Sequence, residues 1–276
     1  MSDHIFLDHD TLGKEVSMSQ VIRYPILDSW VDNVDMHEAL AKVIEFVEKG
    51  QRVHTVFASN PEKNFHIAKD KLLHSVFKTA DLLLPDGIGM IHAMRLVFGE
   101  RKRRVTGCDF MESICALAAA KKYKVFVYGA KEEVNLKAVE TLQSKYPRLQ
   151  IAGRSNGYVA EDDMGSLVQK INESGAEILF LALGSPKQEY WVAKHAHELK
   201  NVRVCQGIGG TLDVVAGNVK RAPEFFCKTG MEWLYRLISE PKRWKRQLVL
   251  PVFAARIVAS KVCFWRHPGV DEIAPT

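Results

Sequence analysis

A single aspartate stands at the point where a strongly apolar run of the chain ends. Asp86 follows residues 82–85, Leu-Leu-Leu-Pro, and precedes two glycines in the stretch PDGIG. A carboxylate before a helix can cap backbone N–H groups, and this structural explanation is open. Capping does not require the two glycines, which allow another molecule to approach the backbone closely. Asp86 is therefore a candidate general base toward an acceptor hydroxyl.

Two other glycine-rich or polar stretches have residue types suited to binding a phosphorylated ligand. In GIGGTLD, we expect Gly207, Gly209 and Gly210 to turn backbone N–H groups toward an anion. The GxGxxG spacing of a dinucleotide site is absent. In SPKQEYW, the serine and proline fit the cap and first position of a helix. Gln188, in the first turn of that helix, can hydrogen-bond a sugar or a base.

No metal site is predicted. Asp162 and Asp163 form a pair of acids, but they fit better the acidic first turn of a helix, where negative charge meets the helix dipole. The five cysteines are odd in number and form no CxxC pair, which indicates reduced residues and not a disulfide or zinc framework. We therefore expect neither a required metal nor a cofactor.

Short apolar runs alternate with amphipathic segments from about residue 20 to residue 218. The runs are apolar without clean alternation, as expected when helices cover both faces of a parallel sheet. This pattern predicts a doubly wound, mainly parallel α/β fold of the Rossmann-like kind. Ligands bind beyond the carboxyl ends of strands in such a sheet, and the candidate residues occupy the corresponding turns. The predicted strands are 52–59, 81–85, 124–130, 177–184 and 202–209, and the predicted helices are 35–50, 108–123, 132–146 and 162–175.

Composition divides the chain into three parts. Residues 1–20 form a candidate disordered extension, residues 21–219 an α/β catalytic domain, and residues 220–276 a basic, aromatic-rich helical appendage. Between residues 220 and 267, eleven Lys or Arg stand against three Glu, although the net charge of the whole chain is only +5. A basic end on a nearly neutral body favours a polyanion, a phosphorylated ligand or an anionic membrane surface as partner.

Arginines and aromatic residues interleave in the appendage. Arg236, Arg243 and Arg246 are spaced to share one face of a continuous helix, for which a solvated basic face is the ordinary explanation. Nearby Trp and Tyr residues are also typical of segments at lipid headgroups. Arginine forks pair well with diphosphate oxygens. The apolar stretch 248–265 contains two basic residues, so we expect no membrane span.

Together the motifs resemble the WecG/TagA/CpsF family, glycosyltransferase family 26. The resemblance covers roughly residues 22 to 250, through NPE, PDGIG, RVTGCDF, VYGAK, GSPKQE, GIGGTLDVVAG, RAP and EWLYRLISEPKRWKRQ in that order. It implies transfer of a sugar from a UDP-sugar to a polyprenol-diphosphate-linked saccharide in bacterial surface polymer synthesis, with inversion and without a bound metal. It also implies a cytoplasmic protein at the inner face of the membrane, and the acidic N-terminus does not resemble a signal peptide.

The resemblance assigns roles to the candidate residues. Asp86 matches the family's proposed catalytic base, and Arg104 and Gln188 match residues of the sugar pocket. The three appendage arginines match residues implicated in closing over the site and holding the nucleotide diphosphate. The remaining substrate-binding candidates are Asn60, Gly107, Asp109, Gly209, Gly210 and Asp213.

One position departs from the family pattern. Many relatives have threonine two residues before the asparagine of the NPE turn, and this chain has Ala58 there. Ser59 and Thr55 are the candidates to replace the missing hydroxyl.

Two other function classes stay open from the sequence. The α/β pattern also fits another nucleotide-dependent enzyme, such as a dehydrogenase or methyltransferase, although the missing GxGxxG counts against it. The basic appendage also fits a non-catalytic module that binds a membrane or a nucleic acid. The ordered motifs favour the glycosyltransferase, whose expected partners are a UDP-sugar donor, a lipid-linked saccharide acceptor and an anionic membrane, and no nucleic acid. A homo-oligomer stays open, since apolar appendage surface can be buried by self-association.

Overall fold

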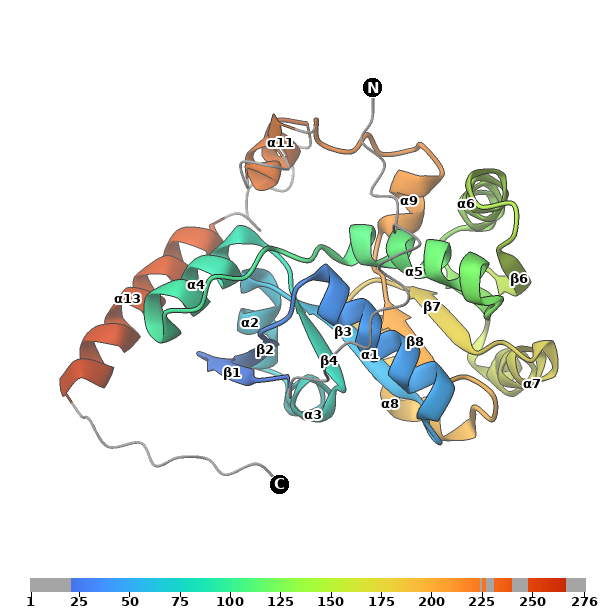
Figure 1. The fold of residues 1–276 in the computed structure, drawn as a ribbon, viewed down its shortest axis with the longest axis horizontal. Coiled ribbons are helices and arrows are strands. Elements are labelled where there is room, and N and C mark those ends of the chain that lie inside the picture. Colours follow the sequence, from blue (N-terminus) through green and yellow to red (C-terminus); the bar gives the residue numbers. More distant parts are fainter. Residues whose placement is uncertain (1–20, 224, 227–230, 240–247, 267–276) are drawn as a thin grey trace.

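The computed structural model describes residues 21–223, 225–226, 231–239 and 248–266. Its main sheet has six strands in the order β4-β3-β8-β7-β5-β6, and every pairing is parallel (Figure 1). All five predicted strands are present, and β6 is an additional edge strand. The strands are β3 (His54–Ser59), β4 (Leu82–Pro85), β5 (Lys124–Gly129), β6 (Gln150–Ser155), β7 (Ile178–Ala182) and β8 (Val204–Gly207).

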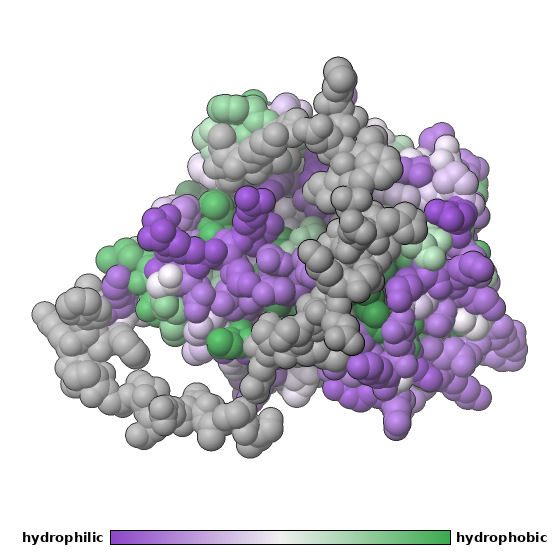
Figure 2. Space-filling view, viewed as in Figure 1, coloured by the Kyte–Doolittle hydropathy of each residue, from purple (hydrophilic) through white to green (hydrophobic). Residues whose placement is uncertain are grey.

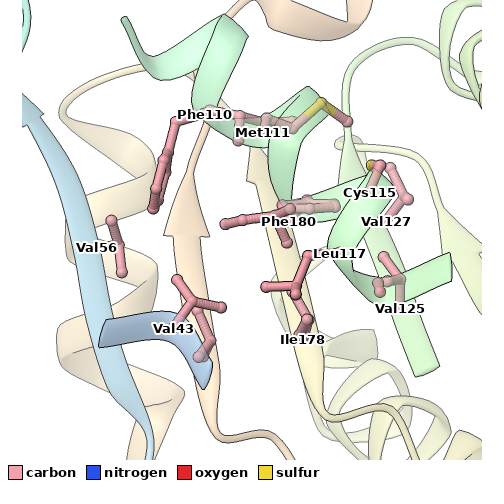
Figure 3. Close-up of a cluster of buried hydrophobic side chains, with 14 of the residues drawn as sticks. Val43, Val56, Phe110, Met111, Cys115, Leu117, Val125, Val127, Ile178 and Phe180 are labelled. Carbon is pink, nitrogen blue, oxygen red and sulfur yellow. The ribbon is translucent and has the colours of Figure 1, made fainter. Parts of the chain in front are cut away.

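Helices cover both faces of this sheet, which confirms the doubly wound α/β fold. One layer contains α1 (Met36–Lys49), α5 (Gly107–Lys121), α6 (Glu132–Lys145) and α9 (Thr211–Val215). The other contains α2 (Pro61–Ile67), α3 (Lys71–Thr79), α7 (Met164–Ser174) and α8 (Lys187–His195), with one-turn helices η1 (Glu161–Asp163) before α7 and η2 (Ala196–Glu198) after α8. Asp162 and Asp163 thus precede α7, as expected. Figure 3 shows the first layer, where α5 packs on β5 and β7 through fully buried apolar side chains.

A third hydrophobic cluster lies beside the sheet. It joins the antiparallel hairpin of β1 (Arg23–Ile26) and β2 (Ser29–Asp32) to α4 (Ile88–Phe98) and α13 (Val249–Arg266). Phe253 and Ile257 of α13 are buried in it, against Met90, Ala93 and Met94 of α4. Figure 1 shows α13 alongside α4. Part of the predicted appendage therefore shares a core with the α/β domain.

The remaining described helix of the appendage is α11 (Glu232–Ser239), which lies above α4 and α5 in the view of Figure 1. Within the described ranges, no helix combines the length and the apolar character that crossing a bilayer requires.

The amino ends of β3 and β4 are joined by a polar cluster around Asp81. Its carboxylate accepts hydrogen bonds from Arg52 Nη1 at 3.0 Å and from the Thr55 backbone N–H at 2.9 Å, and one oxygen lies 3.1 Å from His54 Nδ1. Burial alone would raise the pKa of Asp81, but the hydrogen bonds from Arg52 and Thr55 outweigh it and lower that pKa. This cluster lies at the opposite end of β4 from Asp86, so it stabilises the sheet without entering the site.

Candidate functional site

The sequence-predicted residues converge at the carboxyl ends of four adjacent strands. Asn60 follows β3, Asp86 follows β4, Gly209 follows β8, and Gln188 lies on the helix after β7. Arg104 is next to the end of β4, because the N–H of the following residue donates to the carbonyl oxygen of Pro85 at 3.0 Å. Residues separated by more than a hundred positions therefore meet at one edge of the sheet, where open parallel sheets bind their ligands.

Asp86 is held by backbone contacts at this edge. Its N–H donates to the carbonyl oxygen of Ser59 at 3.1 Å, and the N-cap position of α4 is occupied by Gly87, not by Asp86. Asp86 therefore lies one residue before the N-cap position of α4.

The backbone conformation and the packing within the chain explain why positions 87 and 89, after Asp86, are glycines. Gly87 has φ of +83°, which favours glycine, and a Cβ on Gly89 would lie 2.7 Å from Cγ of Pro61. The close approach expected from a ligand is thus made by the neighbouring turn of the same chain.

Asn60 begins α2 as its N-cap. Its side-chain oxygen accepts from the backbone N–H of Lys63 at 2.9 Å, and Pro61 occupies the first helical position. The side-chain oxygen of this predicted substrate-binding residue therefore already has a structural partner, and its contact with substrate stays a prediction.

Neither candidate replaces the hydroxyl missing at Ala58. Side chains alternate along a strand, so Thr55 and Ser59 point to the opposite face of β3 from Ala58. Ser59 is fully buried and donates to the carbonyl oxygen of Trp30 at 2.7 Å, while Thr55 joins the Asp81 cluster at the other end of the sheet. Gly107 lies beside Ala58, because a Cβ added at Gly107 would lie 3.8 Å from Cβ of Ala58.

Two ion pairs connect the first turn of α5 and the residues just before it with the residues after position 220. Arg104 Nη2 lies 2.9 Å from a carboxylate oxygen of Glu232, the first residue of α11, and both side chains are about 15% exposed. Asp109 pairs with Arg221 and also accepts from the hydroxyl of Thr106 at 2.7 Å. Sequence reasoning missed Glu232 and Arg221, because pairing across more than a hundred residues leaves no local pattern.

The polar groups below the glycine turn are buried. Gln188 is 2% exposed, and its side-chain oxygen accepts from the N–H of Gly209 at 3.0 Å. A Cβ on Gly207 would lie 2.5 Å from Nε2 of Gln188, so Gly207, the last residue of β8, is a packing glycine. The N–H of Gly209 therefore already has a partner within the chain, and the expectation that Gly207, Gly209 and Gly210 turn N–H groups toward an anion stays a prediction. Whether Gln188 contacts the sugar stays a prediction.

The other predicted nucleotide contacts lie around this turn. The carbonyl oxygen of Gly107, the first residue of α5, accepts from Gln206 Nε2 at 3.1 Å. Gly210 is exposed at the N-cap of α9, and Asp213 lies half-buried in that five-residue helix. Pro186, and not the expected serine, is at the N-cap of α8, after a cis Ser185–Pro186 peptide bond.

Of the three appendage arginines, the structure describes only the backbone of Arg236. Arg236 belongs to α11, but its side chain, together with Arg243 and Arg246, lies outside the described residues. In the described part of the chain, no three His, Cys, Asp or Glu side chains gather as a metal site. Cys108, beside the site, is no nucleophile at neutral pH, because burial raises the pKa of its thiol to about 12.

The arrangement brings a carboxylate, a guanidinium and glycine-rich turns to one edge, with α11 joined to it by Glu232. A carboxylate can accept a proton from a hydroxyl, and a guanidinium can neutralise an anionic leaving group. These groups suit transfer from an anionic, phosphorylated donor to a hydroxyl acceptor.

Comparisons with known proteins identify the family. The glycosyl transferase WecG/TagA/CpsF family matches residues 24–267. An N-acetylglucosaminyldiphosphoundecaprenol N-acetyl-beta-D-mannosaminyltransferase of Bacillus subtilis is 36% identical over 240 residues, 84% of this chain and 93% of the relative. A transferase of the same name from Bacillus spizizenii is 37% identical over 203 residues, 74% of this chain and 78% of the relative. The chain belongs to the WecG/TagA/CpsF family of glycosyltransferases.

Proposed function

We propose that this protein transfers an N-acetylhexosamine from a UDP-sugar to a saccharide linked to polyprenol diphosphate. The observation that carries the proposal is the convergence of Asp86, Arg104 and the glycine turn after β8 at one edge of the sheet. The Bacillus relatives, named for transfer of N-acetylmannosamine to N-acetylglucosaminyl-diphospho-undecaprenol, support the donor and acceptor classes.

Asp86 acts as the general base. Its carboxylate takes the proton of the acceptor hydroxyl as that oxygen attacks the anomeric carbon from the face opposite the UDP. The bond from the anomeric carbon to the diphosphate oxygen breaks, UDP leaves with the bonding electron pair, and the configuration at the anomeric carbon inverts. A positioned base of this kind contributes about 10² to 10⁴ in rate.

Arginines neutralise the negative charge that develops on the departing UDP, so the reaction proceeds without a bound metal. Arg104 contributes from the turn before α5, and Arg236, Arg243 and Arg246 contribute from the appendage. The ion pair between Arg104 and Glu232 supports this role, because it ties the first residue of α11 to the edge of the sheet.

The appendage also docks the protein on an anionic membrane, where the lipid-linked acceptor resides. Support comes from the exposed apolar side chains of Trp233 and Ile238 on α11 and of Val252 and Val258 on α13. Figure 2 shows hydrophobic surface over α11. Together with the basic residues of this part of the chain, these side chains suit a headgroup interface.

The test is acceptor-dependent release of UDP from a panel of UDP-sugars, beginning with UDP-N-acetylmannosamine. The acceptor is a short-chain polyprenol diphosphate carrying N-acetylglucosamine, and each reaction is run with and without EDTA. We expect release with one donor, unchanged by EDTA, and an inverted product linkage by NMR. Release that requires added metal would refute metal independence, and no release with any donor would refute the proposed reaction.

A further inference from the structure

A buried ion pair crosses beneath the site. Lys63, in the first turn of α2, and Glu189, in the first turn of α8, have Nζ and Oε1 2.9 Å apart. Glu189 is fully buried, and Lys63 is 9% exposed. Because α2 follows β3, α8 follows β7 and β8 lies between these strands, the pair spans the strand from which the Gly209 turn emerges.

Stability alone is a weak explanation for this pair. Removing two charges from water opposes folding, and a pair of well-packed apolar residues of similar volume often leaves a protein as stable or more stable. The Lys63 ammonium lies 5.9 Å and 5.2 Å from the ring centres of Phe57 and Phe77, which offsets part of that cost. Within the part of the chain that the structure describes, Oε2 of Glu189 has no hydrogen-bond partner. Burying these two charges therefore opposes folding, and the contacts of Glu189 indicate a role for the ion pair other than stability.

Glu189 fixes the orientation of the Gln188 amide. Oε1 of Glu189 accepts from Lys63 Nζ and also from Gln188 Nε2 at 3.2 Å, while Gln188 Oε1 accepts from the N–H of Gly209 at 3.0 Å. If the amide were flipped, its oxygen would face a carboxylate oxygen and its NH₂ would face a backbone N–H. The carboxylate therefore selects the one orientation in which Gln188 can hold Gly209.

The same network reaches both turns at the edge of the sheet. On one side it holds Gly209, whose φ of +55° places it in the left-handed region. On the other side it begins at Lys63, whose backbone N–H is capped by Asn60. We propose that Lys63 and Glu189 are positioning residues that set the Gly209 turn relative to the Asn60 turn for the donor. The part that concerns the donor rests on the proposed function.

The main test replaces both charges with apolar residues of similar size, Lys63→Met with Glu189→Met. We expect a melting temperature close to that of wild type, because no lone charge is left buried. Hydrogen exchange of peptides covering residues 207–213 should be about tenfold faster, as for loss of one net hydrogen bond. The KM for the donor should rise about tenfold while the KM for the acceptor is unchanged, since misplaced binding groups act on their own substrate.

Two further variants keep the test decisive. Glu189→Gln retains the side-chain volume but removes the charge that orients Gln188. Because it leaves the Lys63 charge without a counter-charge, its exchange is compared across the whole chain, and acceleration confined to residues 207–213 is the expected result. Val168→Ala, on the buried face of α7, is the stability control and should lower the melting temperature without changing either KM.

Unchanged exchange at residues 207–213 in a folded double variant, or an unchanged donor KM, would overturn the proposal. Wild-type protein that releases no UDP with any donor would instead refute the proposed function. The exchange readout needs no substrate and would still decide whether the pair holds the Gly209 turn.

Discussion

Replacing Phe253 with alanine tests whether α13 is part of the folded core. Phe253 is 2% exposed and packs with Ile257 against α4 and the β1–β2 hairpin. Its ring is also next to the first turn of α4, because a Cβ added at Gly89 would lie 3.8 Å from the Phe253 ring. The variant therefore leaves a cavity close to the start of the helix that follows Asp86.

The expected cost follows from the lost burial and the cavity. Phenylalanine to alanine in a well-packed core typically costs about 3 to 5 kcal/mol. At the lower value the melting temperature of a domain of this size falls by roughly 6 to 12 °C. Val252, the preceding residue of α13, is 51% exposed, so Val252→Ala should stay within about 0.5 kcal/mol of wild type.

The measurement is thermal and urea unfolding of the full chain for both variants, followed by UDP release at a temperature where both are folded. We expect Phe253→Ala to be destabilised and also to have a lower kcat, because α4 is less well supported next to Asp86. Equal unfolding midpoints for Phe253→Ala and Val252→Ala would refute the packing of α13 on α4.

Three further changes test other parts of the structure. Gly89→Ala should lower the melting temperature, because its Cβ would lie 2.7 Å from Pro61; an unchanged value would contradict that contact. The lowered pKa of Asp81 gives stability that is present above about pH 4 and is lost as the pH falls through the lowered pKa. Asp81→Asn should therefore lower the free energy of unfolding in urea by about 1 to 3 kcal/mol at pH 7, and the difference from wild type should be smaller at pH 3. The same difference at both pH values would refute the role of the Asp81 charge in stability. Glu232→Gln removes the charged partner of Arg104 and should lower kcat/KM for the donor about tenfold; equal kinetics would show that this ion pair has no role in donor use.

The sequence predicted the main sheet well because its strands are buried on both faces. The strands β4 and β7 consist of buried residues along their whole length, and such runs are recognisable without an alignment. The edge strand β6 was missed because its residues are at most partly buried and include Gly153. The Phe126 ring packs against Gly153, where a Cβ would lie 2.6 Å from the ring. The β1–β2 hairpin was missed because two four-residue strands outside the main sheet carry little pattern.

The sequence predicted which turns carry the candidate residues, but not what those residues contact within the chain. Strand-end geometry brought Asp86, Asn60 and Gly209 together, as the sequence predicted. The internal partners could not be predicted, because they are set by tertiary packing. The glycines of PDGIG accommodate Pro61, and Gly209 is held by Gln188. No spacing along the chain encodes either contact.

The most direct test of the proposed mechanism compares wild type with Asp86→Asn in acceptor-dependent UDP release. Asparagine keeps the size of the side chain but cannot take the acceptor proton. The account predicts that kcat falls by about 10² to 10⁴, while the KM for the donor and the melting temperature stay close to those of wild type. Equal kcat values in wild type and Asp86→Asn would contradict the role of Asp86 as the general base.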